Sequence, residues 1–133
     1  DDLHPEGFHA APPGKRVASM MAPMLILRDG AVRWVLGSGG SRRIRSTLVQ
    51  VVTHLIDFDR TLAQAIAAPR LYWDVECVHA EPGYSDEAIE HLRERVPVQV
   101  WAAKDLFFGG VHAVDTQAGG VGDARRGGES ATV

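Results

Sequence analysis

The chain has 133 residues, of which 45% are hydrophobic and 23% are charged, and its formal net charge is −3. A chain of this length can bury a core and forms either one globular domain or one piece of a larger domain. The mild charge argues against a nucleic-acid-binding surface, and no apolar run approaches the roughly 20 residues of a membrane span. Cys77 is the only cysteine, so an internal disulfide bond is excluded.

A proline- and glycine-rich segment opens the chain, and a predicted β-hairpin follows it. Residues 1–16 are expected to form an extended arm. The run 20–27 is apolar, and apolar side chains recur at every second position over 32–36. The pair Asp29-Gly30 between these runs predicts a two-residue hairpin turn. Because the first run is apolar at consecutive positions, we expect both faces of the hairpin to be covered.

The sequence Gly-Ser-Gly-Gly-Ser at 37–41 joins this hairpin to a predicted helix of about four turns, with Ser41 as its N-cap. The apolar positions of that helix are Ile44, Leu48, Val51, Val52, Leu55 and Ile56. The first N–H groups of a helix have no intrahelical partner, and glycine lets a ligand approach the backbone closely. We therefore interpret 37–41 as a turn that binds an anion or an oxyanion. A strand-to-helix turn that binds nothing is the alternative.

The second half of the chain alternates between further helices and strands. Thr61 is predicted to cap a short helix that ends before Pro69, and Ser85 a helix that reaches about Arg95. Strands are expected over 75–81, 98–101, 111–117 and 119–125. This order is typical of an α+β or mixed α/β layered architecture. We expect one domain or a fragment of one, divided into an arm over 1–16, a core over 17–126 and a tail over 127–133.

Three arginines follow the glycine-rich turn and define a second possible function. Arg42, Arg43 and Arg45 could close on a phosphate or a carboxylate, or they could form the solvated face of the helix. If they close on an anion without catalysis, the chain is a non-catalytic anion-binding or scaffold domain.

No metal or cofactor site is expected from the remaining side chains. The six histidines are scattered, and only His79 and Glu81 could share one face of a strand. Asp57 and Asp59 could form an acid–base pair, although two acids at a helix end are more often solvated. Spacing alone identifies no Ser/His/Asp set and no activated Cys/His pair.

Nine short motifs occur in one order along nearly the whole chain. They are Asp1-Asp2-Leu3, Pro13-Gly14-Lys15-Arg16, Ser19-Met20-Met21-Ala22-Pro23, Asp29-Gly30, Leu36-Gly37-Ser38-Gly39-Gly40-Ser41, Thr47-Leu48-Val49-Gln50-Val51, Ala68-Pro69-Arg70, Phe108-Gly109-Gly110-Val111-His112-Ala113-Val114 and Gly122-Asp123-Ala124-Arg125-Arg126-Gly127-Gly128. Together they resemble the gamma-glutamyltransferase family. The resemblance implies an α+β fold, namely the second part of the αββα sandwich of an N-terminal-nucleophile hydrolase. The chain looks like the C-terminal part of that family's small subunit.

The resemblance also implies a reaction and its residues. The whole enzyme would transfer or hydrolyse the γ-glutamyl group of a small-molecule substrate through an acyl-enzyme, without a cofactor. Gly39 and Gly40 match the glycines whose N–H groups form the oxyanion hole. Ser19 matches a serine that holds the substrate's α-carboxylate, and Asp2 matches the acid that holds its α-ammonium. The remainder of the precursor, with the large subunit and the start of the small subunit, would be the partner of this chain.

The chain also departs from the family pattern. Met20 replaces a second serine, the glycine-rich loop is one residue short, and Ala124 stands where the family has proline. The nucleophilic threonine is not found, because all threonines here are internal and lack a free α-amino group. The first residue is not methionine, which suggests a processed product or a fragment. We therefore expect this chain to be inactive alone, and to form a homo-oligomer or bind a partner chain through its sheet edges.

Overall fold

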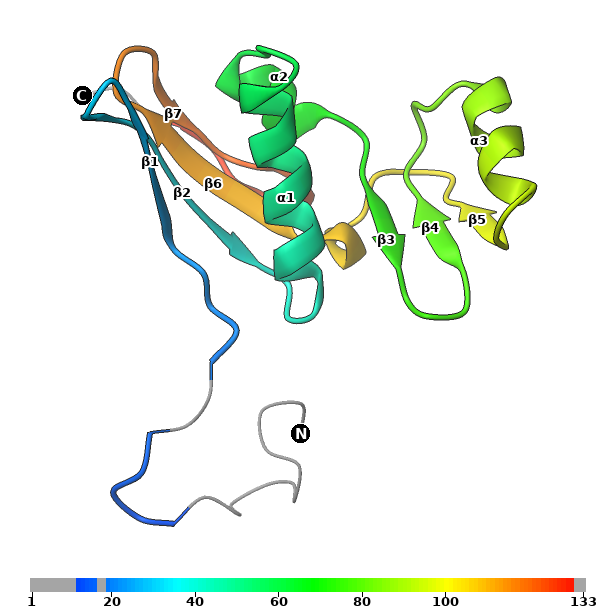
Figure 1. The fold of residues 1–133 in the computed structure, drawn as a ribbon, viewed down its shortest axis with the longest axis horizontal. Helices are drawn as coiled ribbons and strands as arrows, with labels where there is room; N and C mark the ends of the chain where they lie inside the picture. The colour runs from blue at the N-terminus through cyan, green and yellow to red at the C-terminus, as the bar shows by residue number, and fades with distance from the viewer. Residues whose placement is uncertain (1–11, 17–18, 131–133) are drawn as a thin grey trace.

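The computed structural model describes residues 12–16 and 19–130. Its elements form a four-stranded sheet with two helices on one face, and a smaller three-stranded sheet with one helix beside it (Figure 1). Residues 12–16 lie away from both sheets and contain no helix or strand. The α+β prediction is confirmed.

The predicted hairpin is present at the start of the larger sheet. Strand β1 (Met24–Arg28) pairs antiparallel with β2 (Ala31–Gly39). Asp29 and Gly30 both have positive φ angles, 52° and 79°, as the favoured two-residue hairpin turn requires. The first strand is shorter than predicted, because the chain enters the sheet only at Met24.

The larger sheet has the strand order β1-β2-β6-β7, and every pair in it is antiparallel. Its last two strands are β6 (Gly110–Asp115) and β7 (Gly119–Val121). The predicted strand over 119–125 is wrong at its end, where the 3-10 helix η2 (Ala124–Arg126) replaces it. The Asp123 carboxylate accepts a hydrogen bond from the Arg125 N–H at 3.0 Å and caps this turn.

Two helices cover one face of this sheet. Helix α1 (Arg43–Ile56) and helix α2 (Leu62–Ala67) pack on its central and last strands. Thr61 caps α2 as predicted, since its hydroxyl accepts from the Gln64 N–H and the Gln64 side chain accepts from the Thr61 N–H. The buried core between the helices and the sheet contains Trp34, Leu36, Ile44, Leu48, Val51, Leu55, Leu62, Ala65, Ile66, Val111 and Ala113.

The opposite face of the larger sheet is open, so the prediction that both faces are covered is wrong for this chain. Leu25 and Leu27 of β1 are 63% and 58% exposed, and Val35 and Val114 are 40% and 48% exposed. The reason is that α1 and α2 pack only on the face to which Leu36 points. We call the exposed side the open face, defined by Leu25, Leu27, Val35 and Val114.

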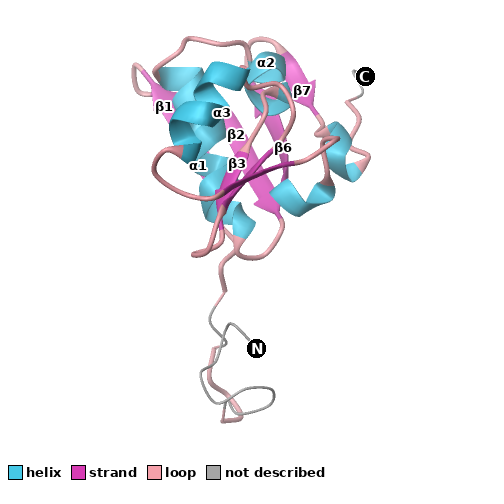
Figure 2. Ribbon diagram, turned by 90° about the vertical axis from the view of Figure 1, so that its right-hand side faces the viewer, coloured by secondary structure: helices cyan, strands magenta, loops and turns pink. Residues whose placement is uncertain are grey.

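The smaller sheet has the order β3-β4-β5 and lies beyond α1 (Figure 1). Figure 2 views the molecule from the side on which this sheet lies. Its strands are β3 (Leu71–Trp73), β4 (Val78–Ala80) and β5 (Val98–Val100). The first, β3, was not predicted, whereas β4 and β5 lie within the predicted strands 75–81 and 98–101. Helix α3 (Asp86–Arg93) contacts β5, and the Ser85 hydroxyl caps it as predicted.

The longest helix, α1, has 14 residues and spans about 21 Å. Within residues 12–16 and 19–130, no helix combines the length and the apolar character that a membrane crossing needs.

Candidate functional site

The glycine-rich segment differs from the predicted loop. Strand β2 continues to Gly39, which pairs with Gly110, so only residues 40–42 form the turn into α1. Gly40 has a φ of 134°, and Ser41 has a φ of 53°. Ser41 is therefore not the N-cap: it takes a left-handed conformation that favours glycine, and α1 begins after Arg42 without a side-chain cap.

Two successive amides of this turn are available to a ligand. No described residue accepts a hydrogen bond from the N–H of Gly40 or of Ser41. Both amides lie just before the N-terminus of a 14-residue helix, where the peptide dipoles add partial positive charge. Consecutive N–H groups in unusual backbone conformations form concave sites for anions. The turn can therefore receive a negatively charged oxygen.

The turn is held against a second pair of glycines. A β-carbon added to Gly40 would lie 2.9 Å from the Gly109 Cα, so only glycine fits there without a shift of the backbone. Thr47 of α1 donates a hydrogen bond from its hydroxyl to the Phe108 carbonyl at 2.7 Å, and Arg70 donates from Nη1 to the Gly109 carbonyl at 3.0 Å. The position of the turn thus depends on the segment before β6.

Four buried charged residues stabilise that segment, and we call them the buried ion-pair network. The Arg70 Nη2 lies 2.6 Å from the Asp123 Oδ2, and the Arg125 Nη2 lies 2.5 Å from the Glu81 Oε2. The Asp123 Oδ2 also accepts from the Val111 N–H at 2.9 Å. The side chains of the network are between 0% and 3% exposed. The network therefore fixes the start of β6 to the chain around Ala68–Arg70 and Asp123–Arg125.

Two groups of this network, Asp123 and Arg125, stay charged despite their burial, whereas burial lowers the pKa of the Arg70 guanidinium. Although burial opposes ionisation of Asp123, the Val111 N–H and the Arg70 guanidinium hold the pKa of this carboxyl below its ordinary value. Burial likewise opposes the charge of Arg125, yet its bonds to Glu81 and Asp123 raise the pKa of the guanidinium. Arg70, Asp123 and Arg125 occur within the family motifs, but the sequence alone indicates no role for them. Their complementarity to Glu81 appears only once the chain is folded.

The predicted substrate-binding residues are placed in part. The Ser19 hydroxyl accepts a hydrogen bond from the Met21 N–H at 3.2 Å and is solvent-exposed. Met20 is partly buried and packs against the core. Asp2 lies outside the described residues. The assignments of Ser19 and Asp2 therefore remain predictions.

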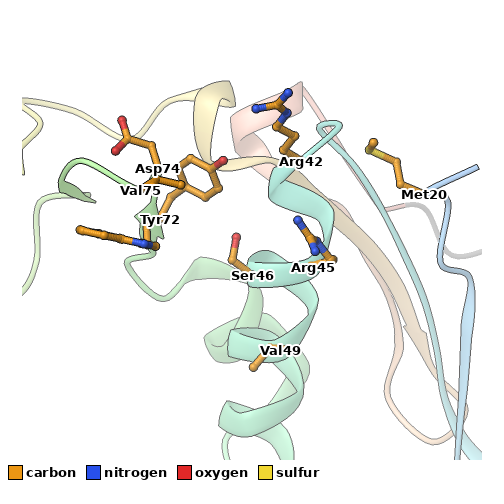
Figure 3. Close-up of a pocket in the computed structure, with 9 residues that line it drawn as sticks. Met20, Arg42, Arg45, Ser46, Val49, Tyr72, Asp74 and Val75 are labelled. Atoms are coloured by element: carbon orange, nitrogen blue, oxygen red, sulfur yellow. The ribbon is translucent and has the colours of Figure 1, made fainter. Parts of the chain in front are cut away.

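The three arginines after the turn do not converge on one point. Arg43 turns toward two aromatic rings, with its Cζ 4.2 Å from the ring centroid of Phe107 and 4.9 Å from that of Tyr72. Arg42 and Arg45 instead line an open groove of about 730 Å³ across α1, with Met20 on one side and the tip of the β3–β4 hairpin on the other (Figure 3). The groove is lined by Met20, Arg42, Arg45, Ser46, Val49, Tyr72, Trp73, Asp74 and Val75.

His79 and Glu81 do not cooperate, because Glu81 belongs to the buried ion-pair network. His79 instead forms a group with Asp74 and Cys77, whose ligand atoms all lie within 4.8 Å of one another. The Trp101 Nε1–H donates to the His79 Nδ1 at 3.2 Å, so in the neutral ring the proton is on Nε2 and faces the Asp74 Oδ2 at 2.7 Å. A metal on Nε2 would need the opposite tautomer, which the indole N–H opposes. Burial also raises the pKa of the Cys77 thiol, so the group is best described as a hydrogen-bonded turn.

Asp57 and Asp59, the possible acid–base pair, are both exposed at the end of α1. Among the residues that the structure describes, neither carboxylate has a hydrogen-bond or ion-pair partner. They do not belong to the site at the other end of this helix.

Comparison with known proteins places the chain in a family. The family profile of gamma-glutamyltranspeptidase matches residues 1–133. The chain is 33% identical over 94 residues to the Acylase ACY 1 proenzyme of Pseudomonas sp. (strain SE83), which is 71% of this chain and 17% of that protein. It is 34% identical over 89 residues to the Glutathione hydrolase proenzyme of Escherichia coli (strain K12), which is 65% of this chain and 15% of that protein. The chain thus spans about one sixth of the length of these curated relatives.

A solved structure supports the same family assignment. The gamma-glutamyltranspeptidase from Pseudomonas nitroreducens, in complex with L-DON, superposes with a TM-score of 0.75 at 27% sequence identity. The match covers 93% of this chain and 67% of that chain. The fold is therefore the one found in gamma-glutamyltranspeptidases, and the resemblance noted in the sequence is confirmed. The chain belongs to the gamma-glutamyltranspeptidase family.

Proposed function

We propose that the whole protein transfers or hydrolyses a γ-glutamyl group through an acyl-enzyme, as a gamma-glutamyltransferase or glutathione hydrolase does. In this proposal the present chain supplies the oxyanion hole, and the nucleophilic threonine lies in the part of the protein that precedes it. The names of two relatives, a glutathione hydrolase and an acylase, agree with acyl transfer to an amine or to water.

The observation that carries the proposal is the turn at the end of β2. The proposed donors are the N–H groups of Gly39 and Gly40, with the Ser41 N–H next to them; Gly39 belongs to the β2–β6 ladder, whereas Gly40 and Ser41 lie in the turn. The amides of Gly40 and Ser41 have no acceptor among the described residues, and Gly109 holds the turn in place. Attack on an amide carbonyl places negative charge on one oxygen, and donors fixed in advance lower the barrier for this step.

The remainder of the precursor is the proposed partner of this chain. The relatives are proenzymes, and the open face exposes leucine and valine side chains that a second layer would bury. Without the segment that carries the nucleophile, the 133-residue chain is expected to be inactive. A γ-glutamyl anilide turned over by this chain alone would contradict that expectation.

The test of the oxyanion hole uses valine substitutions in the complete protein. Gly40→Val requires a side chain at a φ of 134° and against the Gly109 Cα, and Gly39→Val forces a side chain toward the Arg126 guanidinium. We expect kcat for a γ-glutamyl anilide to fall about 10²–10³-fold in Gly40→Val, the typical effect of one lost donor. The fall is expected to be smaller in Gly39→Val, because an arginine side chain can move.

Ala31→Val is the control, because Ala31 lies in the same strand, is exposed, and stands at the end of β2 opposite the turn. It should keep kcat within about twofold. Unfolding curves of all three variants separate loss of catalysis from loss of fold. A folded Gly40→Val protein with the wild-type kcat would refute the role of this turn.

A further inference from the structure

We propose that Arg126 is a substrate-binding residue that pairs with a carboxylate of the substrate beside the Gly39–Gly40 turn. The inference rests on the proposed function, since it assigns a further contact within the same site. The Arg126 side chain is exposed, and the sequence alone indicates no role for it.

Two glycines make room for this arginine. Gly39 of β2 and Gly110 of β6 are directly paired across the sheet. A β-carbon on Gly39 would lie 3.2 Å from the Arg126 Cζ and 3.3 Å from its Nη1, and a β-carbon on Gly110 would collide with its Cγ and Cδ. The aliphatic part of Arg126 therefore lies over Gly110, and its guanidinium lies over Gly39, next to the proposed oxyanion turn.

The side of the sheet follows from the alternation along β2. Trp34, Leu36 and Ser38 are buried, whereas Val35 is exposed on the open face. Because side chains alternate along a strand, a side chain at Gly39 would point to the same face as that of Val35. The Arg126 guanidinium thus lies at the end of the open face, on the side opposite α1.

Arg125 and Arg126 are neighbours in the sequence but differ in burial and in their ion-pair partners. The Arg125 side chain is 3% exposed and bonds Glu81 and Asp123, so its charge is compensated. Arg126 is exposed, and no described residue accepts a hydrogen bond from its guanidinium or forms an ion pair with it. Two consecutive arginines therefore have different tasks: the first holds the turn η2, and the second presents an unpaired fork of N–H donors.

Hydrogen bonds hold the backbone around Arg126 in place. The Arg126 N–H donates to the Asp123 carbonyl at 3.1 Å, and the Gly128 N–H donates to the same carbonyl at 2.9 Å. Asp123 is itself fixed by Arg70 and by the Val111 N–H. The buried ion-pair network therefore positions both the oxyanion turn and the base of Arg126.

A carboxylate is the group that this arrangement fits. A guanidinium offers parallel N–H donors that match the two oxygens of a carboxylate, and it keeps its charge at any working pH. A γ-glutamyl donor carries an α-carboxylate, and a peptide that leaves or accepts the acyl group carries another. Both have the same chemistry, so substrate pairs must distinguish them.

The experiment measures kcat and KM of the complete protein with and without Arg126→Gln. The first pair of substrates is a γ-glutamyl anilide and its α-carboxamide. The second pair consists of the acceptors glycylglycine and glycylglycinamide, with the anilide as donor. Arg28→Gln is the matched control, since Arg28 is an exposed arginine at the far end of the same sheet.

We expect the wild-type protein to prefer the carboxylate form in one of the two pairs. Arg126→Gln should reduce that preference about 10- to 100-fold, chiefly through KM, which is the usual loss for a hydrogen bond to a charged group. The neutral form and the Arg28→Gln protein should be unaffected. If the donor pair loses its preference, Arg126 binds the α-carboxylate of the γ-glutamyl donor. If the acceptor pair loses it, Arg126 binds the carboxylate of the peptide.

Two results would overturn the inference. Unchanged preferences in both pairs would mean that Arg126 does not bind a carboxylate. An equal fall of kcat for charged and neutral substrates would mean that it acts on the reacting group or on the fold. If the wild-type protein turned over neither anilide, the proposed function itself would fail, and this outcome is distinct from both.

Discussion

The two sides of the larger sheet differ in what they bury and in what they expose. The helix-covered side contains the apolar core, and the buried ion-pair network closes its end near α2 with every charge paired. The open face exposes leucine and valine, and at its end lies an arginine without a described partner, beside two unpaired amides. The interactions that stabilise the fold thus lie on the helix-covered side. The groups that could still bind a partner or a ligand lie on the open face and at its end.

The largest effect on stability is expected from Asp123. Asp123→Ala leaves the Arg70 guanidinium buried without its carboxylate, and removing one partner of such a pair costs about 3–5 kcal/mol. Denaturant unfolding of the complete protein measures this change, with Asp57→Ala as the control because Asp57 is exposed and unpaired. A loss below about 1 kcal/mol would show that the network does not hold the closed side together.

The same carboxylate predicts a pH dependence. Its pKa in the folded state is below its ordinary value of 3.8, so its stabilisation is complete above that value and is lost as the pH falls through the lower folded pKa. The free energy of unfolding should therefore decrease below about pH 4. The decrease should be shallower in Asp123→Asn, which has no proton to gain at this position.

The next comparison uses one leucine from each side. Leu55 of α1 is 2% exposed, and Leu55→Ala should cost about 2–5 kcal/mol. Leu27 of β1 is 58% exposed, and in the 133-residue chain Leu27→Ala should change stability by about 0.5 kcal/mol or less. In the complete protein its cost should rise above about 1 kcal/mol, because the proposed second layer buries it. If Leu27→Ala also costs about 0.5 kcal/mol or less in the complete protein, no second layer covers the open face.

The smallest change in stability is expected at Ser41, in the turn between β2 and α1. Ser41 is held at a φ of 53°, a conformation that costs a residue with a β-carbon about 1–2 kcal/mol. Ser41→Gly removes this strain but makes the unfolded chain more flexible. A gain of about 0.5–1 kcal/mol, measured by thermal unfolding, is expected. A loss of stability would indicate that the serine side chain contributes a contact of its own.

Local pattern determined much of this fold. Asp29-Gly30, Thr61 and Ser85 predicted a turn and two caps correctly, because these features depend on residues within three or four positions of one another. The motif order identified the family. By contrast, Ser41 was wrong as a cap, and the three-residue strand β3 was missed.

Tertiary structure alone decided the site. The buried ion-pair network joins residues up to 53 positions apart, and the contact of Arg126 with Gly39 joins residues 87 positions apart (126 − 39). Periodicity carries no information about such pairs, because the packing of segments far apart in the sequence brings them together. The sequence by itself therefore determined the class, the family and the glycine-rich turn. The folded chain decided which amides lack a described acceptor, which arginine side chain is buried, and which one is exposed beside the turn.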